Sequence, residues 1–440
     1  MSNSNSVKQS SSGIDYKMEF SAGLSTYLTL SYIFLLNPIL LSKAGMDISA
    51  AFFATVVSAA AATFIMGAIA KLPFAVAPAP SITTFFVSFV CIQLGLSWQG
   101  ALAAVVLSGV LSILMTKLSI RGKLIDTIST PLRVGVLLAI SGFLVANGLV
   151  QGKVVSYNNG LFDFAKFNFN NLISPSAIVL YTGLAVTLLF RMKWFRFSAA
   201  PILGILSAAI LAASFGIKSG TKAKFSTDMF GSVGQVDFSS LLDSRFIIAM
   251  LIFFIIDFFA GVGKYIGLFS AMGDKGKEIE KKGMGNALYV DGFGNIIGGF
   301  LGASSLAVFV SSAVGIRAGG KTGWTAIFTS MFMLLGLFII PLVGAIPVEA
   351  TSGILIYVGC ILIPVKDLQP KNGVLSIFDV VASSVAFLIS FFSYGLDKAI
   401  LLVFLVYTIK ILLRGPKKDD LILILTTLFL LAAIIAQMFL

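Results

Sequence analysis

Three charged side chains lie inside long apolar stretches, where burying an ionised group costs free energy. Asp257 and Lys264 fall within residues 246–270, and Asp291 falls within residues 285–302. If these stretches cross a lipid bilayer, each charge costs at least about 2.5 kcal/mol on insertion scales, so that function is the first interpretation. A carboxylate or an amine could carry a coupling proton there. Lys264 could instead extend toward the end of its helix, or form a structural ion pair with Asp291.

The chain offers little of the chemistry that enzymes use. It contains no histidine, which excludes His-based zinc sites and Ser-His-Asp or Cys-His catalysis. Cys91 and Cys360 each lie within an apolar stretch, which is typical of small buried side chains. The sequence has no Walker loop, nucleophile–base pair or metal-ligand cluster. We therefore expect no enzyme activity, no catalytic residue, no metal and no cofactor.

Two segments interrupt the apolar pattern with prolines, glycines and hydroxyl side chains. Residues 73–93 and residues 304–316 are the third segments of their respective halves. Broken backbone at membrane depth is tolerated only where protein or a water-filled cavity satisfies its polar groups. Matched interruptions in two halves predict an inverted repeat with a binding site between two half-helices. The alternative is two kinked helices whose small residues serve close packing. The polar side chains here are Ser81, Thr83, Thr84, Ser304, Ser305, Ser311 and Ser312.

Long apolar segments, which would position these side chains, make up most of the chain. Hydrophobic residues make up 58% of the chain and charged residues only 11%, whereas about a quarter of a soluble domain is charged. A spanning helix needs about 20 largely apolar residues. This length predicts an all-α polytopic membrane protein with fourteen transmembrane segments in a 7+7 inverted repeat. The segments are 20–41, 49–71, 73–93, 97–117, 131–151, 174–190 and 198–216, then 246–270, 285–302, 304–316, 321–342, 348–364, 375–394 and 396–413.

The positive charges set the expected orientation. The formal net charge is +12, and most Lys and Arg residues fall in breaks on the same side as the N-terminus. Basic residues gather on the cytoplasmic side of membrane proteins, beside anionic lipids, which explains the charge without nucleic acid. We expect a multi-pass protein of the cell membrane with a cytoplasmic tail at residues 1–18 and cytoplasmic loops at 117–133, 191–196 and 273–284. The extra apolar residues 421–440 could span the membrane or lie along its surface.

Several motifs, taken together, resemble one transporter family over nearly the whole chain. They are Thr26-Tyr27-Leu28-Thr29 with Ser31-Tyr32-Ile33 and Asn37-Pro38-Ile39-Leu40, then Leu72-Pro73, Asp291-Gly292-Phe293-Gly294-Asn295, Arg317-Ala318-Gly319-Gly320-Lys321-Thr322-Gly323, and Pro341-Leu342-Val343-Gly344. The family is the nucleobase–ascorbate transporters (xanthine/uracil permeases), in their AzgA-like purine permease branch.

The resemblance implies a core domain of helices 1–4 and 8–11 and a gate domain of helices 5–7 and 12–14. Residues 19–151 would then form the first part of the core and the start of the gate, and residues 174–216 gate helices 6 and 7. Residues 246–342 would form the second part of the core, and residues 348–413 gate helices 12–14. The resemblance also implies elevator-like movement of the core, proton-coupled uptake of nucleobases and a homodimer.

The expected site departs from the family's pattern. The helix-8 motif Asp-x-x-Asp-Thr-x-Gly-Thr appears as Asp257-Phe258-Phe259-Ala260-Gly261-Val262-Gly263-Lys264, so that Ala260 replaces an acid and Lys264 a threonine. The Glu-Ser pair of helix 10 falls on Ser311-Ser312, and Gly-Met-Gly-Leu-Asn of helix 3 falls on Ala79-Pro80-Ser81-Ile82-Thr83. Two lost negative charges and one added cation make the expected site more positive.

We therefore expect a secondary active transporter for a purine nucleobase of the guanine, hypoxanthine or adenine type. The alternative is a transporter of a small anion (sulfate, a carboxylate or a urate-like solute) on the same scaffold, and a channel or receptor is a further class. The expected partners are the small-molecule substrate, a coupling proton, the lipid bilayer and a second copy of the chain. The expected substrate-binding residues are Ser81, Thr83, Thr84, Asp257, Gly261, Lys264, Ser311 and Ser312, and the proton-coupling candidates are Asp257, Asp291 and Lys264.

Overall fold

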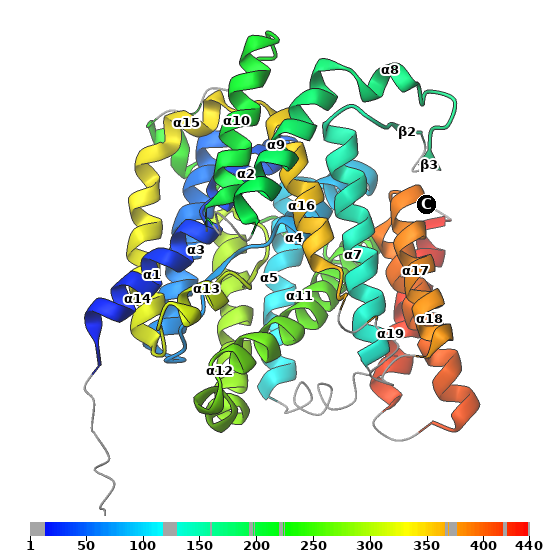
Figure 1. Cartoon of the computed structure of the whole chain (residues 1–440). Coiled ribbons are helices and arrows are strands. Elements are labelled where there is room, and N and C mark those ends of the chain that lie inside the picture. The colour runs from blue at the N-terminus through cyan, green and yellow to red at the C-terminus, as the bar shows by residue number, and fades with distance from the viewer. Residues whose placement is uncertain are drawn as a thin grey trace, which may run out of the picture.

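The computed structural model describes residues 14–117, 130–158, 161–192, 197, 199–219, 223, 225–365, 368, 376–416 and 420–438. These residues are mostly helical, and their helices pack side by side as one bundle (Figure 1). The predicted tail up to residue 13 and most of the predicted loops 117–133 and 191–196 lie outside the described residues.

Each segment predicted to span the membrane contains helical residues. The helices of the first half are α1 (Tyr16–Leu30), α2 (Ile33–Ser42), α3 (Ile48–Ala68), α4 (Pro80–Thr84), a π-helix (Phe85–Gln93), α5 (Trp98–Lys117), α7 (Thr130–Gln151), α8 (Phe169–Leu172), α9 (Pro175–Arg191) and α10 (Ala200–Ser214). Those of the second half are α11 (Ser244–Ala271), α12 (Asp274–Leu301), α13 (Ser312–Arg317), α14 (Gly323–Leu335), α15 (Ile340–Ala345), α16 (Ser352–Leu362), α17 (Ile377–Phe392), α18 (Leu396–Arg414) and α19 (Leu421–Met438). Among the described residues, five helical stretches are both long and apolar enough to cross a membrane.

Capping side chains set where several of these helices begin. Asp47 precedes α3 and accepts hydrogen bonds from the backbone N–H groups of Ser49 and Ala50 (2.8 and 2.9 Å). Ser376 precedes α17 and forms a capping box with Asp379. These bonds satisfy backbone donors that have no partner within the first turn of a helix.

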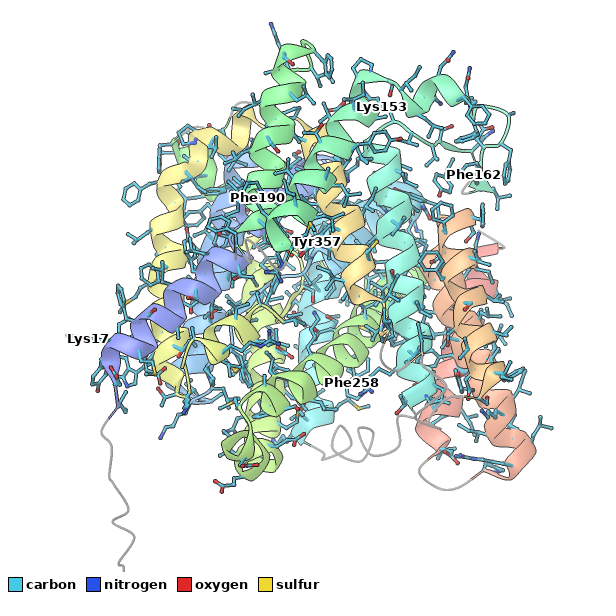
Figure 2. The ribbon with its side chains drawn as sticks, viewed as in Figure 1. Lys17, Lys153, Phe162, Phe190, Phe258 and Tyr357 are labelled. Atoms are coloured by element: carbon cyan, nitrogen blue, oxygen red, sulfur yellow. The ribbon has the colours of Figure 1, made fainter. Side chains whose placement is uncertain are left out.

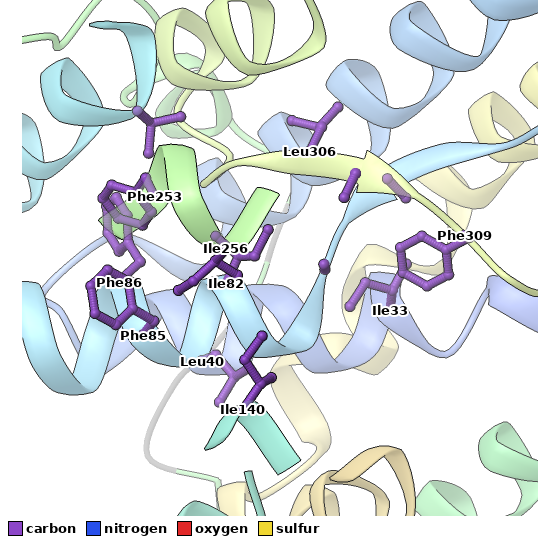
Figure 3. Close-up of a cluster of buried hydrophobic side chains, with 14 of the residues drawn as sticks. Ile33, Leu40, Ile82, Phe85, Phe86, Ile140, Phe253, Ile256, Leu306 and Phe309 are labelled. Carbon is purple, nitrogen blue, oxygen red and sulfur yellow. The ribbon is translucent and has the colours of Figure 1, made fainter. Parts of the chain in front are cut away.

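Two short strands join the interrupted segments of the two halves. Strands β1 (Val76–Pro78) and β4 (Leu306–Val308) pair antiparallel, with Val76 opposite Val308 and Pro78 opposite Leu306. Figure 3 shows Leu306 and Phe309 along this second segment, with buried apolar side chains such as Ile82 packed nearby. The broken backbone of each half is therefore satisfied partly by the other half, as a broken helix at membrane depth requires.

The structure corrects three expectations drawn from the sequence. The predicted tail 1–18 ends sooner, because α1 already begins at Tyr16. The predicted loop 273–284 is instead the first part of α12, which starts at Asp274; its many charges concealed it from a search for apolar length. The all-α prediction also omitted two strand pairs, β1 with β4 and β2 (Tyr157–Asn158) with β3 (Leu161–Phe162).

The helices form two packing groups. The first group contains α1, α3, α5, α11, α12 and α14, and the second contains α7, α9, α10, α16, α17 and α18. Glycines allow close approach within the first group, since a Cβ on Gly109 of α5 would lie 2.7 Å from the backbone oxygen of Gly292 of α12. Helix α19 packs on both groups, through α18 and α11.

Candidate binding site between two broken helices

Each interrupted segment is a strand followed by a short helix. We call residues 75–84 the first arm (β1 and α4) and residues 304–317 the second arm (β4 and α13). The Ser312 hydroxyl accepts a hydrogen bond from the Ala75 N–H, and the Phe309 N–H donates to the Ala75 carbonyl (both 2.9 Å). The short helices confirm that neither segment is an unbroken helix.

Hydroxyl side chains attach the first arm to its surroundings. Thr63 of α3 donates to the Val76 carbonyl and accepts from the Val76 N–H, both at 2.9 Å. The Thr83 hydroxyl donates to the side-chain oxygen of Asn37 (2.6 Å) and is hydrogen-bonded to the Ser304 hydroxyl (2.7 Å). Thr83 therefore connects the first arm to α2 and to the second arm.

A cavity of about 250 Å³ lies where the two short helices begin. This volume is slightly below the ~300–1,000 Å³ that small-molecule sites usually enclose, so it suits a small solute. Both packing groups contribute to its wall. The lining residues are Thr29, Tyr32, Ala79, Pro80, Ser81, Arg191, Pro201, Lys264, Phe309, Val310, Ser311, Ala313, Val314, Arg317, Tyr357, Val358, Ile361 and Leu362.

Three of the predicted substrate-binding residues line this cavity: Ser81, Lys264 and Ser311. Within the described part of the chain, the buried Ser311 hydroxyl has no hydrogen-bond partner, which leaves it available to a ligand. The others are buried and do not line the cavity; they are Thr83, Thr84, Asp257, Gly261 and Ser312.

The buried acids are held by neighbouring side chains. The Asn295 amide donates to Asp257 (3.0 Å), and its oxygen accepts from the Ser305 hydroxyl (2.9 Å) next to β4. Asp291 accepts from the Tyr265 hydroxyl (2.7 Å). Asp257 is therefore connected through Asn295 to the second arm, and neither carboxylate lies in the cavity wall.

The cavity wall itself is positive. Lys264 is half-buried, and the charges of both Asp257 and Asp291 act on it from behind the wall. Arg191 and Arg317 line the cavity and are exposed to solvent. No acidic residue is present among the described lining residues. Such a surface attracts anions and carbonyl oxygens.

The sequence analysis missed several lining residues. Tyr32 and Arg317 belong to motifs that it recognised, but no role followed from their spacing. Arg191 and Tyr357 belong to the second packing group and become neighbours of the arms only in the folded chain. Figure 2 shows Tyr357 near the centre of the bundle. A single polar or aromatic side chain in an apolar helix gives no signal of such a distant contact.

Comparison with known proteins identifies relatives over most of the chain. Residues 17–366 match the Permease family. The adenine permease AdeP of Escherichia coli (strain K12) is 30% identical over 92% of this chain and 90% of its own length. The guanine/hypoxanthine permease PbuG of Bacillus subtilis (strain 168) is 27% identical over 92% of this chain and 93% of its own length.

Solved structures show the same fold at low sequence identity. The transmembrane domain of a cyanobacterial bicarbonate transporter, BicA, matches 88% of this chain and 97% of its own with a TM-score of 0.65 and 14% identity. The murine anion transporter Slc26a9 in an inward-facing state matches 90% of this chain and 68% of its own, with a TM-score of 0.63 and 14% identity. At this identity the likeness concerns the fold alone.

Proposed function

This chain belongs to the permease family of nucleobase–ascorbate transporters, and from that premise we propose that it is a secondary active permease for a purine nucleobase. The observation that carries the proposal is the match to an adenine permease and a guanine/hypoxanthine permease over 92% of the chain in each case. These relatives are permeases, which agrees with the apolar helices described above.

The chemistry of the cavity supports a planar solute with hydrogen-bond acceptors. Tyr32, Phe309 and Tyr357 supply aromatic surface against which a base can pack. Lys264 and Ser311 supply donors. A hydrogen bond to a charged group contributes about 1.5–3 kcal/mol, or roughly ten- to a hundredfold in affinity. We therefore place guanine and hypoxanthine, which present a ring carbonyl, ahead of adenine, which presents an amino group in its place.

The division of the helices into two packing groups supports the proposal that a core domain moves against a gate domain. Both arms pack on the first group, through β1 on α3 and α13 on α1, and the second group contributes Arg191 and Tyr357 to the cavity wall. Sliding of the first group would carry the cavity from one side of the membrane to the other, as an elevator mechanism requires. The proposal includes fourteen spans, a cytoplasmic N-terminus and a homodimer, as the family resemblance implies.

The buried acids support coupling to a proton. Asp257 and Asp291 are fully buried, and both act on Lys264, which contacts the cavity. Protonation of either acid would change the field at Lys264 and hence the affinity for substrate. Asp257 also connects through Asn295 to Ser305 beside β4, so a change in its charge would reach the second arm.

A small anion remains the second candidate because the described cavity wall contains Arg191, Lys264 and Arg317 and no acid. The family match and the purine permease relatives favour the nucleobase over this anion.

Counterflow in proteoliposomes tests the proposal. Vesicles loaded with unlabelled hypoxanthine should accumulate labelled hypoxanthine against its gradient, and guanine should compete more strongly than adenine, sulfate or bicarbonate. Accumulation of labelled sulfate or bicarbonate with no purine counterflow would establish the anion in place of the purine. Simple equilibration without overshoot would indicate a channel.

A further inference from the structure

A second cavity lies at the other side of the second packing group. It encloses about 270 Å³ where α7 begins, α18 ends and α19 begins. It shares no lining residue with the first cavity. Its wall consists of Pro131, Leu132, Tyr407, Lys410, Ile411, Arg414, Asp420 and Leu423.

Two cations in this wall have their counter-ions behind them. Lys410 is paired with Asp379 (2.8 Å), and Arg414 is paired with Asp420 (2.8 Å). The carboxylates are 3% and 4% exposed, whereas the Lys410 and Arg414 side chains are 48% and 55% exposed. An ammonium has three donors and a guanidinium has five, so each cation retains donors that its buried carboxylate does not use.

The helices that extend from this cavity present apolar side chains outward. Ile409 and Leu412 of α18 are 54% and 53% exposed, and Leu425 and Leu428 of α19 are 55% and 56% exposed. Exposed leucines in such number are expected where a helix faces lipid tails. The cations thus lie at the end of a lipid-facing apolar surface.

We propose that this cavity binds the phosphate of an anionic phospholipid, whose acyl chains lie along α18 and α19. Arg414 can contact two phosphate oxygens at once, and Lys410 adds a point charge beside it. The bias of basic residues predicts that this end is cytoplasmic, and basic pockets between helices on that side recognise lipid head groups.

The position of α19 gives the bound lipid a structural consequence. Thr408 of α18 and Thr427 of α19 are hydrogen-bonded (2.7 Å), and the Arg414–Asp420 pair also joins these helices. A phosphate over Arg414 would hold the start of α19 against α18 while α19 also packs on α11. The lipid would therefore stabilise the helix that contacts both packing groups. This inference does not depend on which solute the first cavity carries.

Lipid binding to the full-length purified protein tests the proposal. The probes are phosphatidylglycerol, cardiolipin and phosphatidylcholine, with inorganic phosphate and glycerol phosphate as soluble controls, and the readouts are native mass spectrometry and thermal unfolding. We expect phosphatidylglycerol to bind at least tenfold more tightly to the parent than to Lys410→Gln/Arg414→Gln. The matched control is Lys17→Gln/Lys321→Gln, which removes two exposed cations elsewhere and should bind as the parent does.

A second variant keeps the proposal falsifiable if loss of the cations leaves the buried acids unpaired and unfolds the protein. Leu423→Phe fills the cavity without changing any charge and should lower phosphatidylglycerol binding by several-fold. Equal binding of phosphatidylcholine would overturn the proposal. So would stabilisation by free phosphate that equals that by the lipid, unchanged lipid binding in both cavity variants, or a second copy of the chain occupying this face in place of lipid.

Discussion

The two arms share one architecture and differ in how they are held. The first arm is attached along its length, by Thr63 at its strand and by Asn37 at its helix, and the π-helix Phe85–Gln93 extends it. The second arm ends after a short helix; Asn295 of α12 holds its strand by accepting from the Ser305 hydroxyl (2.9 Å) and the Leu306 N–H (2.8 Å). Beyond the arm, Glu19 of α1 accepts from the Lys321 N–H (3.2 Å) and the Thr325 hydroxyl.

The difference indicates that the first arm mainly supports the site, whereas the second arm recognises the solute. The first arm contributes Ala79, Pro80 and Ser81 to the cavity wall, whereas the second arm contributes Phe309, Ser311 and Arg317 among others. In the first arm the Thr83 hydroxyl is bonded to Asn37, whereas the buried Thr84 hydroxyl, like the Ser311 hydroxyl of the second arm, has no hydrogen-bond partner among the described residues. The comparison teaches that two arms of similar architecture need not have the same role.

Removal of the attachment of the first arm should give the largest effect. Thr63→Val leaves the N–H and the carbonyl of Val76 without their side-chain partner. Each unsatisfied buried group costs about 1–3 kcal/mol, so we expect a loss of about 2–6 kcal/mol in the free energy of unfolding. Thermal unfolding in detergent measures it, with Thr63→Ser as the control that keeps the hydroxyl. Parent-like stability of Thr63→Val would show that the first arm does not depend on this attachment.

Loss of the cation between the arms should impair transport strongly. Lys264→Met removes one charge-assisted hydrogen bond, and we expect purine transport at limiting substrate to fall ten- to a hundredfold, equivalent to about 1.4–2.7 kcal/mol. Substrate titration of counterflow checks this, with the exposed Lys321→Met as control. If Lys264→Met reduces transport only mildly, Ser311 and the backbone of the arms recognise the purine instead.

Neutralising the acid behind the second arm should affect coupling more than binding. Asp257→Asn can still accept from Asn295 but cannot ionise. We expect a pH gradient to stimulate uptake several-fold in the parent and not in the variant, while counterflow without a gradient persists. Stimulation that survives in Asp257→Asn and is lost in Asp291→Asn would move the coupling site to Asp291.

Substitution of the adjacent serines Ser311 and Ser312 should give the smallest effects, one on substrate affinity and the other on stability. Ser311→Ala should weaken substrate affinity by a few-fold and leave the melting temperature unchanged, because the hydroxyl has no described protein partner. Ser312→Ala should leave affinity nearly unchanged and cost about 1–3 kcal/mol of stability, because it leaves the Ala75 N–H unpaired. The reverse result would exchange the roles of the two serines.

The sequence predicted the helices well because apolar length and interruption are local signals. It located both arms from their prolines, glycines and hydroxyls, and three of its candidate residues, Ser81, Lys264 and Ser311, line the cavity. It did not predict β1 and β4, because two three-residue strands pair only across the fold. Nor could it separate Ser311 from Ser312, whose side chains differ only in what surrounds them, or find Tyr357, which another group of helices brings to the cavity.

The pairing of β1 with β4 also bears on how the protein is made. Ala75, beside β1, is synthesised long before Phe309 and Ser312, the partners of its carbonyl and its N–H. Until the second half is inserted, the first arm must keep unpaired backbone groups at membrane depth, where each costs several kcal/mol. A nascent chain halted before residue 306 should therefore hold the first arm outside the bilayer core or bound to an insertion factor. We therefore expect the candidate site to form late in biogenesis, after both halves of the chain have entered the membrane.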